Sequence, residues 1–478
     1  MGSSEILEAD YLVIGSGAMG MAFVDVLVSE SNASVVIVDR RDRPGGHWND
    51  AYSFLRLHSA SAYYGVSSTA LGRNQIEQLG ANKGFYERAS APEICAYFDR
   101  IMRERFLPTG RVSYFPNSDY RGQGRFVSLV SGVERRVIAR KIVDATFTDT
   151  AVPSRHTRPF HVGEGVQCIA PNALPDAASA DRYVVLGAGK TGMDVSQWLL
   201  DRGVSPDLIT WIMPRDSWLL DRKYYEPGAR GASWTLRMHG LIRQTEIIRE
   251  ARSLSHLFEM LESDGHLLRL NAKVTPTRYR CATVSQHELE QLRRIDNVIR
   301  MGHVVGIERD RIVLERGTVA TSAHTLHIDC TASGIRSRTP VPVFVGNSIT
   351  LQPIRTCQQC FSSGLIAHID LTYADDAEKN ALCRPIPLPI RDVDWLTMFA
   401  MNLMNQGQWM NTPHIRNWIS QTRLDLNYGR VAPFTPEEGE LLQQFRAGAA
   451  AAVQKIPQLL SAATSAPTER SIEPTPVM

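Results

Sequence analysis

Long apolar runs are missing from this sequence of 478 residues. No stretch approaches the roughly 20 consecutive apolar residues that a membrane-spanning helix needs, and the N-terminus has no signal-peptide pattern. A large excess of charge is missing as well, because the formal net charge is only +2 at pH 7. This balance gives no reason to expect nucleic acid or an anionic membrane surface as a partner. We therefore expect a protein without a membrane span and without a nucleic-acid partner.

Cysteine is also scarce. The chain has 7 cysteines, an odd number at scattered positions, which does not fit the disulfide framework of a small secreted protein. We therefore expect a reducing, cytoplasmic compartment. Cys357 and Cys360 have the Cys-x-x-Cys spacing of a redox dithiol, although the apolar stretch after them favours a buried helix in which cysteines pack as small apolar side chains. No second ligand pair lies nearby, so we expect no metal site.

Glycine, by contrast, is concentrated in two segments with the spacing Gly-x-Gly-x-x-Gly: residues 15–20 (the first glycine turn) and residues 187–192 (the second glycine turn). Each follows an apolar run typical of a buried strand, residues 11–14 and 183–186. Between such a strand and a helix, glycines allow a tight turn and let backbone N–H groups approach a pyrophosphate at the positive end of the helix. Two such turns predict a protein that holds two dinucleotides and passes electrons between them.

An acid follows the first glycine turn. Asp39 comes directly after the apolar run 35–38, near the distance of about 20 residues at which dinucleotide-binding units place the carboxylate that binds the ribose hydroxyls. A carboxylate there favours a free 2′-hydroxyl, as in FAD or NAD, and repels a 2′-phosphate. The alternative is that Asp39 is a surface carboxylate at the end of a strand.

A basic residue follows the second glycine turn. Arg215 comes after the apolar run 208–213, and its guanidinium can pair with a 2′-phosphate. Asp216 beside it opposes this interpretation, and the alternative is an exposed arginine in a loop. The pattern favours NADPH over NADH at the second turn.

The order of these units predicts the domain organisation. Two similar strand-end segments, residues 142–146 and 328–334, bracket the second glycine turn, so the chain leaves a first domain at one and returns at the other. We expect an α/β fold with two Rossmann-like dinucleotide-binding domains, in which the FAD domain is discontinuous and the NADPH domain is inserted. Helices are expected over 246–261 and 286–300. The expected boundaries are 1–150 for the first part of the FAD domain, 151–325 for the NADPH domain, 326–445 for the second part with substrate-pocket helices, and 446–478 for a partly disordered tail.

Several patches between residues 10 and 370 resemble one family. Residues 43–48 are similar to the Gly-Gly-x-Trp loop, and residues 52–59 to the segment beneath the flavin ring, of the NADPH-dependent flavin monooxygenases and Baeyer–Villiger monooxygenases. Residues 187–194 and 331–334 resemble further segments of that group. The group's signature of Phe-x-Gly followed by a spaced histidine is not found, and His58 stands where the group often has asparagine.

The resemblance implies FAD and NADPH as cofactors, with contacts at the matching positions. For FAD, the implied contacts are Gly15, Ser16, Gly17, Ala18, Met19, Gly20, Asp39, Arg40, Gly45, Gly46, His47 and Trp48. For NADPH, they are Gly187, Gly189, Lys190, Thr191, Gly192 and Arg215. Trp48 is either such a contact or a core residue.

Three residues are implied near the flavin ring as catalytic candidates: His58, Ser59 and Arg56. His58 is either a hydrogen-bond donor and an acid or base, since its unperturbed pKa is about 6.5, or a histidine that packs structurally. Arg56 is either a part of this site or a ligand of the FAD pyrophosphate. The sequence leaves both pairs of alternatives open.

The implied activity is that of an FAD-dependent monooxygenase that consumes NADPH and O2 and acts on a small organic substrate through a C4a-(hydro)peroxyflavin. The alternative is an FAD-dependent NAD(P)H reductase or dehydrogenase without oxygen insertion, and a further one is a disulfide reductase that uses Cys357 and Cys360. Residues 395–409, rich in Met and Trp, either line the substrate pocket or pack in the core. The substrate, the type of oxidation and the oligomeric state, a homo-oligomer included, stay open.

Overall fold

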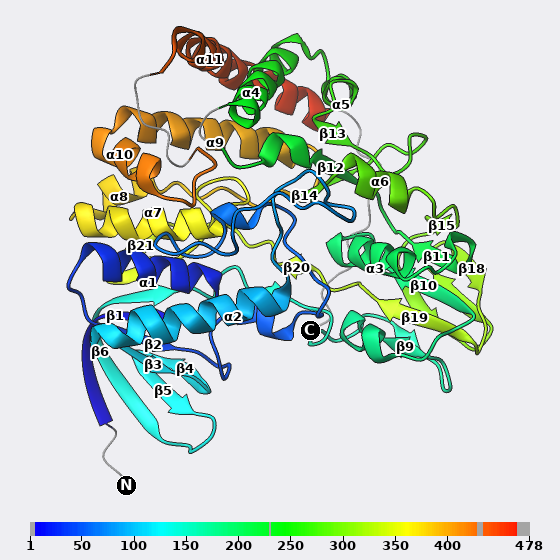
Figure 1. Ribbon diagram of the computed structural model, residues 1–478, viewed down its shortest axis with the longest axis horizontal. Helices are drawn as coiled ribbons and strands as arrows, with labels where there is room; N and C mark the ends of the chain where they lie inside the picture. The colour runs from blue at the N-terminus through cyan, green and yellow to red at the C-terminus, as the bar shows by residue number, and fades with distance from the viewer. Residues whose placement is uncertain (1–4, 229–230, 428–433, 466–478) are drawn as a thin grey trace.

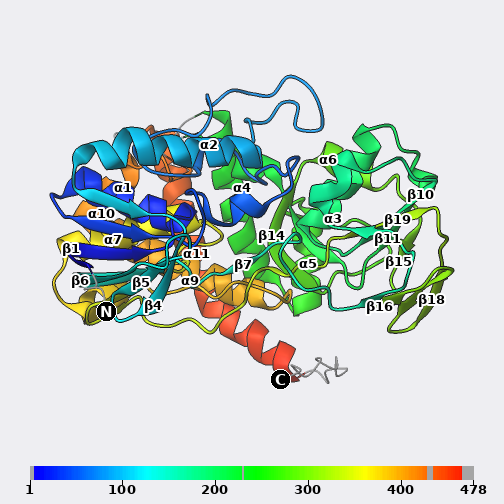
Figure 2. The same cartoon turned by 90° about the horizontal axis from the view of Figure 1, so that it is seen from below.

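The computed structural model of the protein describes residues 5–228, 231–427 and 434–465. Within these residues, two largely parallel β-sheets stand side by side, and several helices lie together across one side of the molecule (Figure 1, Figure 2). The α/β architecture with two Rossmann-like sheets that the sequence predicts is confirmed.

The first sheet contains the N-terminal strand. Its order is β21-β22-β6-β1-β2-β3, and every neighbouring pair except β21 with β22 is parallel. A hairpin of β4 and β5 joins β6 in antiparallel fashion. The strands are β1 (Glu5–Ile14), β2 (Val35–Val38), β3 (Val112–Phe115), β4 (Ser118–Gly122), β5 (Arg125–Ser128), β6 (Glu134–Asp144), β21 (Phe344–Val345) and β22 (Ser348–Thr350).

The second sheet has the order β15-β11-β10-β19-β9, and all of these neighbours are parallel. Strands of such sheets are covered by helices on both faces, which explains why the four residues of β2 and most of β10 are apolar and buried. The strands are β9 (Cys168–Ile169), β10 (Arg182–Leu186), β11 (Ile209–Ile212), β15 (Val298–Ile299) and β19 (Thr325–Asp329).

Two short strands connect the sheets. β7 (Thr150–Ala151) and β20 (Gly334–Ile335) pair in antiparallel fashion, so the segment that leaves the first sheet lies beside the segment that returns to it. Smaller sheets flank the second sheet. They are β13-β12-β14, with β12 (Ser217–Asp221), β13 (Leu267–Leu268) and β14 (Arg278–Val284), and β18-β17-β16-β8, with β8 (His161–Val162), β16 (Val304–Ile307), β17 (Arg311–Leu314) and β18 (Gly317–Ala320).

Helices cover both sheets and form an additional layer. Near the first sheet, α1 packs on α7, and α3 lies beside α6 near the second sheet. Above them, α11 packs against α4, α5 and α9, as Figure 1 shows at its upper edge. The helices are α1 (Ala18–Glu30), α2 (Ala91–Ile101), α3 (Lys190–Asp201), α4 (Ala232–Glu250), α5 (Leu254–Ser263), α6 (Gln286–Leu292), α7 (Gln359–Thr372), α8 (Asp376–Leu382), α9 (Asp394–Asn411), α10 (Pro413–Gln421) and α11 (Pro436–Ser465).

The core is divided between the layers. One apolar cluster lies between the first sheet and its helices, with Phe23 and Leu365 at its centre. A second cluster surrounds Trp211 of the second sheet. A third joins the β12–β14 sheet to α5, α9 and α11 and includes Trp395. Each sheet is therefore held by a core of its own.

The structure differs from the sequence-based prediction in the helices. The helix expected over 246–261 is broken after Glu250, because Ser253 caps a new helix and its hydroxyl accepts a hydrogen bond from the N–H of His256. The helix expected over 286–300 ends at Leu292, and the chain then forms β15, which pairs with β11. In both cases, tertiary contacts decide where a locally favourable helix stops.

The predicted tail is ordered over its first part. Residues 446–465 belong to α11, and Ala452, Ile456 and Leu459 of that helix are buried in the third cluster. Residues 466–478, for which disorder was also predicted, lie outside the described residues. Among the helices that the structure describes, none is both long and apolar enough to cross a bilayer.

Candidate functional site

A large cavity opens between the two sheets. Its volume is about 1720 Å³, which exceeds the range of about 300–1,000 Å³ that is common for one small ligand. Both glycine turns border it, at the carboxyl ends of β1 and β10, which is where open α/β sheets bind ligands. Most of the residues that the sequence implies as cofactor contacts border this cavity. They are Gly15, Gly17, Ala18, Met19, Asp39, Arg40, Gly46, His47, Trp48, Gly187, Gly189, Lys190, Thr191 and Arg215.

The first glycine turn connects β1 to α1 by glycine-specific geometry. Gly15 has a φ of +99°, in the region that favours glycine, and its N–H donates to the carbonyl oxygen of Val38 at 2.8 Å. A Cβ atom at Gly20 would overlap the carbonyl oxygen of Gly15. Gly17 caps α1, so the backbone N–H groups of the first turn of the helix face the cavity end of the strand.

Asp39 is fixed against this turn. Its Oδ2 accepts hydrogen bonds from the N–H of Ser16 at 2.6 Å and from the Ser16 hydroxyl at 2.7 Å. Its Oδ1 accepts from the N–H of Arg41 at 2.8 Å. Only 5% of Asp39 is exposed. The alternative that Asp39 is a surface carboxylate is therefore wrong. Arg40 beside it is exposed and forms an ion pair with Asp119 at 3.1 Å.

The Gly45–Gly46 loop packs on the first glycine turn. The N–H of Gly45 donates to the carbonyl oxygen of Ser16 at 2.9 Å, and both glycines have positive φ. Trp48 is buried in the first core cluster and also borders the cavity, and its indole N–H donates to the Tyr64 hydroxyl at 2.7 Å. Trp48 therefore packs in the core and also borders the cavity.

His47 stacks on Trp48 with 5.1 Å between ring centroids. Burial, together with the positive charge of Arg41, lowers the pKa of His47 to about 4. The imidazole is therefore neutral at physiological pH.

The second glycine turn repeats the geometry of the first. Gly187 has a φ of +121°, and a Cβ atom there would lie 2.6 Å from the carbonyl oxygen of Cys330. A Cβ atom at Gly192 would overlap the carbonyl oxygen of Gly187. At Gly189 a Cβ atom would meet nothing within 4 Å, so this position opens onto free space beside the cavity. A ligand can therefore approach the backbone closely at Gly189.

Lys190 and Thr191, which follow Gly189, take part in a side-chain group at the cavity wall. The Lys190 ammonium forms an ion pair with Asp194 one turn later on α3, and the Tyr52 hydroxyl donates to Asp194 at 2.7 Å. Burial lowers the pKa of Lys190. The charge of this lysine is therefore balanced within the protein rather than held free for a ligand.

Arg215 and Asp216 play separate parts. Asp216 is 4% exposed, and its carboxylate accepts two hydrogen bonds from Arg300, at 2.7 and 2.9 Å. Arg215 is half-buried and borders the cavity. The sequence suggests that the negative charge of Asp216 opposes the binding of an anion at Arg215. Because Arg300 neutralises Asp216, this repulsion is removed.

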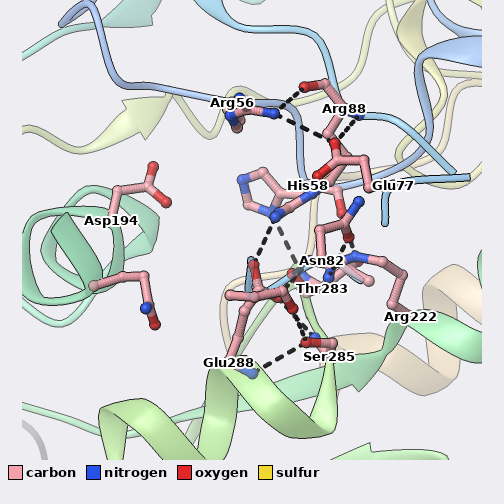
Figure 3. A network of polar contacts seen from close by, with 12 residues as sticks. Arg56, His58, Glu77, Asn82, Arg88, Asp194, Arg222, Thr283, Ser285 and Glu288 are labelled. Carbon is pink, nitrogen blue, oxygen red and sulfur yellow. Dashed lines mark hydrogen bonds and ion pairs between the residues drawn. The ribbon is translucent and has the colours of Figure 1, made fainter. Parts of the chain in front are cut away.

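His58 lies at the centre of a buried polar network that Figure 3 shows. The N–H of Thr283 on β14 donates to His58 Nδ1 at 3.4 Å, and Arg222 Nε donates to the His58 carbonyl oxygen at 3.2 Å. Burial lowers the pKa of His58 well below its usual value, and the positive charges of Lys190, Arg88 and Arg222 add to the effect. His58 is therefore neutral, with the proton on Nε2, and can donate a hydrogen bond from that atom.

Glu288 joins two arginines behind His58. It accepts from Arg88 at 2.8 Å and from Arg222 at 2.6 Å, and the Arg222 side chain is 1% exposed. Burial would raise the pKa of Glu288, but the two guanidinium groups outweigh burial and lower it to about 2. The Arg222 guanidinium also donates to Asn82 Oδ1 at 3.0 Å. These residues are not predicted from the sequence, since they come from distant segments without a recognisable spacing.

The two other catalytic candidates lie at the cavity but face different partners. Arg56 is exposed, and its guanidinium donates to Glu77 at 3.3 Å and to the carbonyl oxygen of Arg88 at 3.2 Å. Ser59 is half-buried at the cavity wall near Tyr63. The structure thus brings His58, Ser59 and Arg56 to the border of the cleft, where the Arg56 guanidinium is engaged by Glu77 and by backbone.

One face of α9 lines the cavity above this site. It presents Trp395, Met398, Phe399, Asn402 and Gln406. Trp409 near the end of the helix is buried elsewhere and donates to the carbonyl oxygen of Leu382 at 2.8 Å. The segment 395–409 therefore borders the cavity with one face, while Trp395, Met398 and Phe399 also pack in the third core cluster.

The alternative of a redox dithiol between Cys357 and Cys360 is not borne out, and Cys360 is buried in α7 as the favoured interpretation expects. Cys357 forms a disulfide with Cys281, which is separated from it by 76 residues. Cys360 is a buried free thiol whose pKa is raised to about 11 by burial. In the part of the chain that the structure describes, no group of three or more His, Cys, Asp or Glu side chains could hold a metal ion.

Comparisons with known proteins give a family model and two kinds of relatives. Residues 13–66, which contain the first glycine turn and Asp39, match the NAD(P)-binding Rossmann-like domain. Solved structures with a similar layout include a polycyclic ketone monooxygenase from Thermothelomyces thermophila, with 13% identity and a TM-score of 0.47 over 94% of this chain and 90% of that one. They also include a cyclohexanone monooxygenase mutant from Rhodococcus, with 14% identity and a TM-score of 0.46 over 77% of this chain and 86% of that one.

Sequence similarity over nearly the whole chain is found with mycobacterial proteins. The protein named Uncharacterized protein Rv2000 from Mycobacterium tuberculosis H37Rv is 48% identical over 472 residues, which cover 98% of this chain and 88% of the relative. Uncharacterized protein Mb2023 from Mycobacterium bovis matches with the same identity and coverage. At this identity over nearly the whole chain, the protein described here belongs to the family of these mycobacterial proteins.

Proposed function

We propose that the protein is an FAD-dependent, NADPH-consuming monooxygenase that acts on a small organic substrate. The single observation that carries the proposal is that two dinucleotide-type glycine turns, on two separate sheets, open onto one cavity. A cavity shared in this way lets a flavin and a nicotinamide meet.

The first glycine turn fits FAD. Glycine is required at Gly15 and Gly20, and Asp39 is held at the end of β2, where its carboxylate suits a ribose hydroxyl. The hydrogen bonds that Asp39 accepts from Ser16 keep its carboxylate oriented. A 2′-phosphate beside this buried carboxylate would be repelled.

The second glycine turn fits NADPH. The open space at Gly189 leaves room for a pyrophosphate against the backbone, and Arg215 stands at the end of β11 with its acidic neighbour neutralised by Arg300. A guanidinium in this position can pair with a 2′-phosphate. We further propose that this unit corresponds to residues 151–325 and the FAD unit to residues 1–150 and 326–445, in a cytoplasmic protein.

When both cofactors are bound, hydride transfer between them and the reaction of reduced flavin with O2 supply the chemistry. The residues of the chain would bind and orient the cofactors and would exclude water from the site. His58 Nε2–H is a donor at the cavity wall that stays neutral at physiological pH. Trp395, Met398 and Phe399 supply an apolar surface that excludes water from the site.

The test is product analysis under labelled oxygen. The purified protein is incubated aerobically with NADPH and 18O2 over a panel of amines, sulfides and ketones, and the products are read by mass spectrometry. The proposal expects one labelled oxygen atom per NADPH consumed in a product. Oxidation of NADPH that yields H2O2 or a reduced acceptor for every substrate would support the alternative, an FAD-dependent NAD(P)H reductase or dehydrogenase.

A further inference from the structure

The disulfide between Cys281 and Cys357 crosses the wall of the cleft. Cys281 lies on β14, and Cys357 lies just before α7, the helix that packs on α1. The bond therefore ties the β12–β14 sheet to the layer that covers the first sheet. Both cysteines are half-buried and both border the cavity, so a small molecule in the cavity can reach the sulfur atoms.

β14 is irregular at its cysteine. The register between β12 and β14 shifts between Trp218 and Leu220, whose partners on β14 are Tyr279 and Thr283. Three residues of β14, centred on Cys281, thus stand opposite a single residue of β12. A bulge of this kind re-aims a side chain and is frequent next to functional sites. Here it accompanies the bond that Cys281 makes to Cys357.

Both cysteines also have an unusual backbone. The φ of Cys281 is +56° and that of Cys357 is +49°, in the left-handed region that costs free energy for residues other than glycine. Such conformations persist where the surroundings hold them, and they cluster at switch regions and functional sites. The two cysteines that form the bond are therefore both held in a backbone conformation of this kind.

The bulge is connected to the candidate site on either side of Cys281. Arg280 donates to the carbonyl oxygen of Ser333 at 2.7 Å, in the segment that returns to the first sheet. The N–H of Thr283 is the hydrogen-bond donor to His58 Nδ1. A change at Cys281 would therefore act within two residues of the contact that fixes the His58 tautomer.

We propose that Cys281 and Cys357 are a redox-active pair that undergoes thiol–disulfide exchange with a dithiol in the cleft, and that the oxidised bond fixes β14 against the segment before α7. The proposal does not depend on the identity of the cofactors. It also reconciles a disulfide with the reducing compartment expected from the sequence, because disulfides in such compartments are those that break and re-form.

The dithiol is the reductant in this exchange, and the atoms and electrons balance. One thiolate of the dithiol attacks one of the two sulfur atoms, the Cys281–Cys357 bond breaks, and a mixed disulfide forms. The second thiolate of the dithiol then attacks the mixed disulfide and releases the bound cysteine. Two electrons pass to the protein, both cysteines take up protons as thiols, and the dithiol leaves as its cyclic disulfide.

Thiol counting on the native protein tests the site. The holoprotein is treated with dithiothreitol without denaturant, then quenched, unfolded and alkylated, and the labels are counted by mass spectrometry. We expect five labelled cysteines before treatment, which are the free thiols, and seven after it, with the new labels on Cys281 and Cys357. Oxidised dithiothreitol should restore five.

Hydrogen exchange tests the consequence. Amides of residues 278–284 and 354–359 should exchange faster in the reduced protein and in the variants Cys281→Ser and Cys357→Ser than in the oxidised wild type. The matched control is Cys360→Ser, which removes a buried free thiol outside the bond, so its labels should rise from four to six on reduction. Seven labels without any reductant, reduction only under conditions that unfold the whole chain, or equal exchange in both redox states would each overturn the proposal.

Discussion

A Cβ atom at Gly46 would lie 2.9 Å from the Cα of Gly17. The loop after β2 therefore rests backbone against backbone on the first glycine turn, and it leaves no room for a side chain between them. This contact joins the two patches from which the sequence predicted FAD binding, although they are separated along the chain by a helix and a strand. It also gives the most direct test of the first site.

Gly46→Ala should lower flavin retention. Gly46 has a φ of +60°, so alanine adds about 1–2 kcal/mol of backbone strain in addition to the clash with Gly17. Gly17→Val places a branched side chain where the pyrophosphate would lie. The measurement is the ratio of flavin to protein absorbance after purification. The control is Gly439→Ala in α11, where a Cβ atom meets nothing within 4 Å, and full flavin content in both test variants would contradict the site.

Arg215→Ala should change cofactor preference. One charge-assisted pair contributes about 1.5–3 kcal/mol, so the KM for NADPH should rise about ten- to a hundredfold while that for NADH changes little. Steady-state NAD(P)H oxidation measures both. Arg202→Ala is a suitable control, because that guanidinium stacks on Trp198 and does not border the cavity. An unchanged preference for NADPH over NADH would show that Arg215 does not bind the 2′-phosphate.

Glu288→Gln should destabilise the protein. The substitution leaves the guanidinium groups of Arg88 and Arg222 buried without an anionic partner, and breaking a buried pair costs about 3–5 kcal/mol. Urea unfolding measures the free energy of unfolding. Glu290→Gln on the same helix changes an exposed side chain and should stay within about 0.5 kcal/mol of wild type. Equal losses in the two variants would show that the network carries no special stability.

Acid should weaken the fold through His47. Its pKa is 6.5 in the unfolded chain and about 4 in the folded protein, so between these values the unfolded state binds more protons. The associated stability is fully present above pH 6.5 and is lost as the pH falls towards 4, by about 3 kcal/mol at most. Thermal unfolding of the wild type and of His47→Gln over this window measures the effect. A variant with the same pH dependence as the wild type would exclude His47 as the cause.

The role of His58 can be separated from its packing. If the Nε2–H of a neutral imidazole is what matters, His58→Asn keeps a donor and should retain product formation, whereas His58→Phe should divert NADPH oxidation towards H2O2. Product and H2O2 formed per NADPH measure the difference. Wild-type turnover should also show no inflection from His58 near pH 6.5, since its pKa lies well below that value. Similar coupling in both variants would mean that His58 is structural.

Much of this protein could be predicted from local sequence. The apolar runs before Gly15 and Gly187 form buried parallel strands, and the glycines fall where a Cβ atom would clash or where φ is positive. Asp39 and Arg215 follow the next strand of each unit as expected. These features are determined within about 30 residues of chain, because a strand, a turn and a helix are specified by neighbouring side chains and backbone sterics.

The tertiary structure alone decided the chemistry between these units. No local pattern indicates that Arg88, Arg222 and Glu288 meet near His58, that Arg300 neutralises Asp216, or that Cys357 bonds to Cys281 rather than pairing with Cys360. Each of these contacts joins segments that are distant in the chain, and it shifts a pKa or closes a bond only when packing brings the groups within a few ångströms. Local spacing determined where the glycine turns lie, while the folding of the sheets against each other determined which side chains surround them and in which charge state.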